Sequence, residues 1–119
     1  MKIAIMKLGE VLITALPLDL IDEDAMGFQT DLLHEINLRD AKGVVIDISA
    51  LDIVDSFMAR IINDSASMAV LLGVKVVVCG MQPQVATTLI EMGRELLGVE
   101  AALNLDLAMQ RLLQRIDDE

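Results

Sequence analysis

The chain has 119 residues, with 9 Lys or Arg against 19 Asp or Glu, so its formal net charge at pH 7 is −10. Nucleic-acid binding depends on Lys and Arg that neutralise phosphates, and the two aromatic residues, Phe28 and Phe57, give bases little surface on which to stack. A hydrophobic fraction of 55% excludes a disordered acidic segment. We therefore expect a folded domain that binds neither nucleic acid nor an anionic membrane.

The longer apolar runs are too short for a membrane-spanning helix, which needs about 18 apolar residues. Residues 69–74 and 76–81, for example, are separated by Lys75. The first residues reach Lys7 and Glu10 without the apolar stretch of a signal peptide. A single cysteine, Cys79, cannot form an internal disulfide. These features predict a cytoplasmic protein.

The N-terminal third predicts a hairpin and a helix. Residues 2–8 and 10–16 are rich in Ile, Val and Leu and are separated by Gly9, as in two paired strands. A helix then follows, for which Asp22 is the expected N-cap at the head of an acidic first turn. Its buried stripe is predicted from apolar residues spaced by three and four: Ala25, Phe28, Leu32 and Ile36.

The middle of the chain predicts a buried strand at 44–48, because this run is nearly all β-branched and apolar. A helix is expected from about Asp55 to Leu72, ending at Gly73. We expect its polar face to carry Arg60, Asn63, Asp64 and Ser67, and its inward face Phe57, Met58, Ile61, Ile62, Ala69 and Leu72.

The last third continues the alternation of strands and helices. A second buried strand is expected at 76–79, then a helix at 84–92 that ends at Gly93. A short, weakly marked strand near Val99 precedes a final helix over 105–116, capped by Asn104, whose buried side includes Leu105, Ala108, Met109, Leu112, Leu113 and Ile116. The expected fold is α/β, with a mixed sheet, an N-terminal hairpin and about four helices.

Few residues are suited to catalysis or metal binding. His34 is the only histidine, and Cys79 is the only cysteine, so a zinc site or a His-dependent triad has too few candidates. We expect His34 at the surface or at its boundary with the core, and Cys79 in the core. The sequence contains no glycine-rich phosphate-binding motif. We expect no cofactor, no metal and no enzymatic activity.

The segment from Asp47 to Phe57 combines the end of a buried strand with a polar loop and a helix start. Asp55 and Ser56 are both good N-cap residues. On spacing alone, capping is the favoured role of the pair. A modification site at Ser56 is compatible with it, because a serine at a helix start is accessible to an enzyme, and a phosphate there would add about −1.5 to −2 charges. The helix dipole would stabilise that phosphate, whereas Asp52 and Asp55 would repel it.

A magnesium pocket formed by Asp47, Asp52 and Asp55 is the alternative use of this segment, since Mg²⁺ is held by one or two carboxylates together with substrate phosphates. Asp47 lies within the predicted strand, and no lysine is clearly placed to bind a phosphate. Solvated loop carboxylates are therefore the favoured interpretation.

This segment resembles the STAS domain family (sulphate transporter and anti-sigma-factor antagonist). Residues 45–56 read Val-Ile-Asp-Ile-Ser-Ala-Leu-Asp-Ile-Val-Asp-Ser, the family pattern of a strand, a loop and Asp-Ser at a helix start. Residues 80–86, Gly-Met-Gln-Pro-Gln-Val-Ala, are similar to the scaffold members of the stressosome, a large signalling particle. The resemblance covers essentially all of residues 1–119, which implies a single STAS domain with no sensory domain before it.

The resemblance implies a non-enzymatic scaffold. Its expected partners are further copies of itself, an RsbR-type STAS paralogue, an RsbT-type serine kinase that it sequesters, and an RsbX-type phosphatase. The motif match places the phosphoacceptor at Ser56, and the implied kinase-facing surface consists of Asp52, Asp55, Ser56, Phe57 and Arg60. A simple anti-sigma-factor antagonist, with the same fold and serine but no large particle, is the alternative function.

Overall fold

The computed structural model describes residues 3–91 and 98–118. Nine elements follow one another: β1 (Ile5–Leu8), β2 (Val11–Ala15), α1 (Asp22–Arg39), β3 (Gly43–Asp47), α2 (Ser56–Leu71), β4 (Lys75–Cys79), α3 (Pro83–Glu91), β5 (Val99–Ala102) and α4 (Leu105–Asp117). The predicted order of strands and helices is confirmed, and the weakly marked strand near Val99 is β5. The predicted end of α3 at Gly93 falls outside the described residues.

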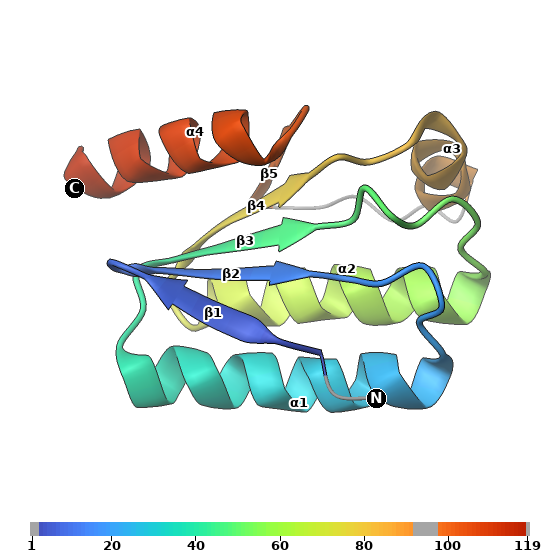
Figure 1. Cartoon of the computed structure of the whole chain (residues 1–119), viewed down its shortest axis with the longest axis horizontal. Coiled ribbons are helices and arrows are strands. Elements are labelled where there is room, and N and C mark those ends of the chain that lie inside the picture. Colours follow the sequence, from blue (N-terminus) through green and yellow to red (C-terminus); the bar gives the residue numbers. More distant parts are fainter. Residues whose placement is uncertain (1–2, 92–97, 119) are drawn as a thin grey trace.

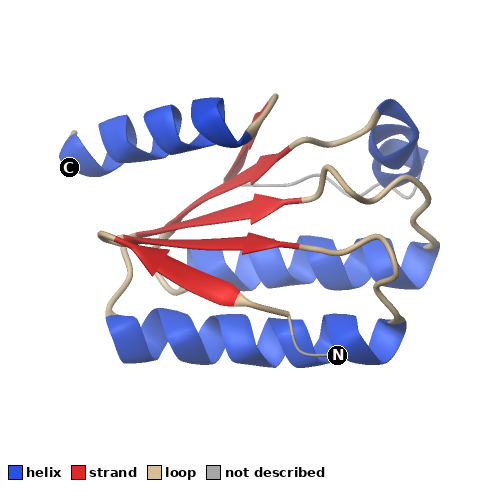
Figure 2. Cartoon of the chain, in the orientation of Figure 1, coloured by secondary structure: helices blue, strands red, loops and turns tan. Residues whose placement is uncertain are grey.

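The five strands form one mixed sheet in the order β1-β2-β3-β4-β5 (Figures 1 and 2). Strand β1 runs antiparallel to β2, and each later strand runs parallel to its neighbour. The turn between β1 and β2 consists of Gly9 and Glu10, and the positive φ of 62° at Gly9 suits a residue without a Cβ. The predicted N-terminal hairpin is thereby confirmed.

Helices α1 and α2 cover one face of the sheet, and α4 lies on the opposite face (Figure 1). Successive residues of the central strands therefore enter different cores: Val44 and Ile46 pack toward α1 and α2, whereas Val45 and Val77 pack toward α4. All four side chains are buried. This burial on both faces explains why these strands are continuous apolar runs.

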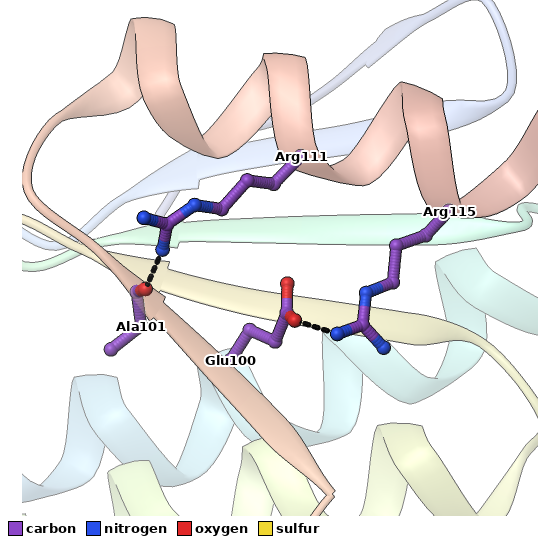
Figure 3. Close-up of polar contacts among 4 residues, drawn as sticks. All are labelled: Glu100, Ala101, Arg111 and Arg115. Atoms are coloured by element: carbon purple, nitrogen blue, oxygen red, sulfur yellow. Dashed lines mark hydrogen bonds and ion pairs between the residues drawn. The ribbon is translucent and has the colours of Figure 1, made fainter.

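Helix α4 is held to its face of the sheet by packing and by polar contacts. Leu112 lies so close to Gly43 that a Cβ there would come within 2.8 Å of its side chain. Arg111 donates a hydrogen bond to the backbone oxygen of Ala101, and Arg115 forms an ion pair with Glu100 (Figure 3). These contacts attach α4 to β3 and β5.

The buried stripe predicted for α1 is confirmed, since Ala25, Phe28, Leu32 and Ile36 are its buried residues. The predicted N-cap is wrong. Ile21 is the N-cap and makes no side-chain capping bond, and Asp22 is the first helical residue. The acidic first turn of Asp22, Glu23 and Asp24 is present as predicted.

The predicted inward face of α2 is rotated from the observed one. Phe57 is 42% exposed and Leu72 is also exposed, whereas Asn63, predicted on the polar face, is buried. Helix α2 packs against α1 as well as the sheet, as shown by the hydrogen bond from Gln29 Nε2 to Ser65 Oγ (3.2 Å). The buried residues are Met58, Ala59, Ile62, Asn63, Ser65, Ala66 and Ala69.

The buried side of α4 is narrower than predicted. Ala108 and Leu112 are buried, but Leu105 and Leu113 are exposed because α4 covers only part of its face of the sheet. Asn104 caps the helix as predicted, accepting a hydrogen bond from Leu107 N–H at 2.9 Å. None of the described helices is long and apolar enough to span a membrane.

Candidate functional site

The loop between β3 and α2 is anchored in the core at every third residue. Ile48, Leu51 and Val54 are buried, and they alternate with exposed residues that include Asp52 and Ile53. Hydrophobic burial at three points in eight residues fixes the path of the loop without regular secondary structure. The loop therefore presents its exposed side chains from a defined backbone.

Backbone hydrogen bonds fix the start of this loop. Ser49 N–H donates to the Asp47 carboxylate (2.9 Å), Leu51 N–H donates to the Ile48 oxygen (3.0 Å), and Ile48 N–H donates to the Cys79 oxygen on β4 (3.0 Å). The Asp47 side chain thus forms a turn of the type for which Asp is favoured. It stabilises the exit from the strand.

The turn that follows β4 packs against the same loop. Gln82 Nε2 donates to the Ser49 oxygen at 2.8 Å. Gly80 has a φ of +75°, and a Cβ at this position would lie 2.6 Å from the Cβ of Ser49. Both loops therefore meet at the carboxyl ends of β3 and β4, where open α/β sheets commonly carry their functional residues.

Helix α2 begins at Ser56, with Asp55 as its N-cap. The Asp55 carboxylate accepts the Met58 N–H at 2.8 Å, which satisfies one of the free donors of the first turn. Ser56 is exposed, and its hydroxyl forms no hydrogen bond with any described residue. Since no acidic residue lies in the first turn of α2, the helix dipole there is offset only by the cap.

The five predicted surface residues, Asp52, Asp55, Ser56, Phe57 and Arg60, are all exposed. We use the name β3–α2 surface for these five residues together with Ile53. Ile53 was missed by the sequence analysis although it is 87% exposed. Ile53 and Val54 both lie between Asp52 and Asp55, and nothing in the sequence shows which of the two is exposed. Ile53 and Phe57 give the surface an apolar component, and Arg60 gives it a positive charge.

The alternative of a magnesium pocket finds no support in the described part of the chain. No group of three or more His, Cys, Asp or Glu residues there is arranged to hold a metal ion. The carboxylates of Asp47 and Asp55 instead accept backbone hydrogen bonds.

The two remaining candidates, His34 and Cys79, lie on different elements and neither belongs to this surface. His34 is exposed on α1, whereas Cys79 is fully buried at the end of β4. Burial, together with the nearby Asp47 carboxylate, raises the pKa of the Cys79 thiol to about 11. The thiol therefore remains protonated at neutral pH and is a core group, not a nucleophile.

The chain belongs to the STAS domain family, whose pattern matches residues 2–106. It is similar to RsbS of Moorella thermoacetica, solved as a serine-to-glutamate variant, with 37% identity, a TM-score of 0.89 and coverage of 98% of this chain and 99% of RsbS. A chain from the stressosome, described as a signal integration and transduction hub, is 40% identical with a TM-score of 0.85, covering 95% of this chain and 98% of the other.

A third relative is the RsbT co-antagonist protein RsbRA of Bacillus subtilis. It is 30% identical over 124 residues, which cover 98% of this chain but only 45% of RsbRA. Bacillus SpoIIAA in its phosphorylated form shares the fold at 13% identity and a TM-score of 0.68. The predicted family is confirmed, as is the likeness to stressosome proteins.

Proposed function

We propose that this chain is a non-enzymatic, cytoplasmic scaffold of a stressosome, that residues 1–119 form a single STAS domain, and that it sequesters an RsbT-type serine kinase. Phosphorylation of Ser56 by that kinase releases it, and an RsbX-type phosphatase restores the unmodified state. Within the particle the chain assembles with further copies of itself and with an RsbR-type paralogue.

The observation that carries this proposal is the position of Ser56. Its side chain is exposed at the first residue of α2, next to a loop that three buried side chains hold in place. The likeness to RsbS over nearly the whole length of both chains supports the scaffold assignment. The likeness to a stressosome chain supports assembly into a particle.

The charge pattern around Ser56 supports a switch that acts on binding and leaves the fold intact. A phosphate there would add about −1.5 to −2 charges at a helix N-terminus, where the dipole stabilises negative charge. The same phosphate would stand beside Asp55 and near Asp52 on a chain of net charge −10. We expect the β3–α2 surface to become much more negative, so a kinase that binds the neutral serine is repelled.

Phosphosite mapping tests the switch. Incubation with an RsbT-type kinase and ATP should label Ser56, and Ser56→Ala should abolish the label. Ser49→Ala is a matched control, because Ser49 is exposed in the same loop but does not begin the helix. Labelling that persists in Ser56→Ala and disappears in Ser49→Ala would refute the assignment of Ser56.

Co-expression with an RsbR-type paralogue tests the scaffold role against that of a simple anti-sigma-factor antagonist. We expect light scattering to detect a large particle that contains both proteins. A chain that binds the kinase but never enters a particle with the paralogue would instead fit the simple antagonist.

A further inference from the structure

The outer edge of β1 is the open edge of the sheet on the N-terminal side. Strand β1 pairs only with β2 and is the terminal strand among the described elements. Its Met6 and Leu8 side chains are 62% and 60% exposed. Natural proteins usually protect such an edge with proline, bulges or several charges, because it can pair with another strand. Here the strand carries a single charge, on Lys7.

The hairpin register shows which backbone groups of β1 point outward. Leu8 and Val11 flank a two-residue turn and form a hydrogen-bonded pair, and such pairs alternate along an antiparallel ladder. The N–H and C=O groups of Met6 and Leu8 therefore face β2. Those of Ile5 and Lys7 face away from the sheet and are available to a further strand.

Beneath this edge, the side of α1 that faces β1 is acidic. A cavity of about 370 Å³ lies between the start of the chain and α1, lined by Ile3, Ala4, Ile5, Asp31, His34 and Glu35. Glu35 forms an ion pair with Arg39, whereas Asp31 forms none with any described residue. Lys7 is exposed and also lacks an ion-pair partner in the described ranges.

We propose that a second copy of this chain adds to the outer edge of β1 in an antiparallel arrangement, with the two-fold axis at Met6. This inference deepens the self-association of the proposed function and rests on that function for its biological setting. In this register Ile5 of each copy opposes Lys7 of the other, and the outward N–H and C=O groups of both residues are paired. The sheet then continues from one copy into the next.

Charge complementarity favours this occupant and this register. Ile5 and Lys7 lie on the α1 side of the sheet, since they pair with Thr14 and Leu12, and Leu12 packs in the core beneath α1. The register places the ammonium group of Lys7 beside the Ile5 of the other copy, at the mouth of the cavity that contains Asp31 and Glu35. The two-fold axis produces this contact twice, and both copies use the same surface.

The register also prevents like charges from meeting. An axis at Lys7 would bring the two Lys7 side chains together, which is unfavourable for residues directly opposite in a sheet. An axis at Met6 brings two methionine side chains together on the face that α4 leaves uncovered. An acidic chain of net charge −10 repels its own copy over most of its surface, so an edge with one lysine and two exposed apolar side chains is well suited to self-association.

Cysteine cross-linking of the isolated protein tests the register. Met6→Cys should form an intermolecular disulfide under mild oxidation, because residues at the axis form a non-hydrogen-bonded pair with Cα atoms about 4.5 Å apart. Leu8→Cys is the matched control, because Leu8 is about equally exposed. It lies two residues from the axis, so the Leu8 residues of the two subunits would be too far apart to form a disulfide. The native Cys79 is buried and should not react. Equal cross-linking of both variants would overturn the proposed register.

Sedimentation equilibrium on charge variants tests the complementarity. Lys7→Glu and Asp31→Lys should each raise the dimer dissociation constant at least about tenfold, and the double variant should recover most of the loss. Arg60→Glu, on the β3–α2 surface, should leave the dimer unchanged. If Lys7 serves only to block edge pairing, Lys7→Ala will associate more strongly than the unsubstituted chain, and the inference fails.

A chain that remains monomeric at all concentrations would also overturn the inference. None of these outcomes involves the kinase, the paralogue or Ser56. Failure of this interface is therefore distinguishable from failure of the proposed function.

Discussion

Helices α1 and α2 lie on the same face of the sheet and begin at the same end of the molecule (Figure 1), yet their first turns differ. Helix α1 starts after Ile21, with no side-chain cap, and carries Asp22, Glu23 and Asp24 in its first turn. Helix α2 is capped by Asp55 and has no acidic residue in its first turn. The dipole of α1 is thus already offset by carboxylates, whereas that of α2 can still stabilise an added negative charge at Ser56.

The segments that lead into the two helices differ as well. Before α1, Leu18 and Ile21 are exposed, whereas Leu16 is buried and Leu20 packs against the core. Before α2, Leu51 and Val54 are buried and hold the loop against the core. Both segments are therefore anchored by packing, but the start of α2 also has a side-chain cap, which the start of α1 lacks.

The largest expected effect comes from removing a loop anchor. Leu51→Ala should lower the free energy of unfolding by about 2–5 kcal/mol, because it leaves a cavity beneath the loop. Leu18→Ala, at an exposed position before α1, should change it by less than about 0.5 kcal/mol. Urea unfolding measures both values, and similar losses would show that the two segments are anchored alike.

An intermediate effect is expected from the helix caps. Asp55→Ala should cost about 0.5–2 kcal/mol, because the Met58 N–H loses its acceptor. Asp22→Ala should cost no more than about 0.3–1 kcal/mol, since it removes one of three charges and no capping bond. Asp55→Asn retains an acceptor and is the control. If Asp22→Ala destabilises the protein as much as Asp55→Ala in thermal unfolding, the stated difference between the two helix starts is wrong.

The smallest change in stability is expected from charge at Ser56. In Ser56→Asp, the favourable dipole interaction of about 0.3–1 kcal/mol opposes repulsion by Asp55 and Asp52, so the melting temperature should hardly move. Kinase affinity should nevertheless fall, as measured in a pull-down. Ser49→Asp adds the same charge outside the helix start. If it weakens kinase binding equally, the effect comes from net charge and not from the position of Ser56.

Much of the fold could be predicted because strong periodic patterns dominate it. The α1 stripe has apolar residues at spacings of three and four, and the central strands are continuous apolar runs bounded by glycine or polar residues. Such patterns survive in the structure because they reflect burial on one face or on both. The position of Ser56 at a helix start could be predicted for a different reason, because Asp and Ser are favoured where a side chain caps the first turn.

The details that could not be predicted depend on tertiary geometry. Phe57 and Met58 are adjacent, and a rotation of about 100° per residue decides which of them is buried. The outcome is set by how α2 lies against both the sheet and α1, and neither the burial of Met58 nor that of Asn63 follows from the order of residues along the helix. Likewise, three consecutive acidic residues at 22–24 gave no signal as to which of them, if any, would be the cap of α1.

The anchoring of the β3–α2 loop by Ile48, Leu51 and Val54 separates the residues that maintain its shape from those that meet other molecules. Exposed positions such as Asp52 and Ile53 can therefore be exchanged during gene duplication at almost no thermodynamic cost. Substitutions at these positions can therefore change what the loop binds while its backbone keeps the same path.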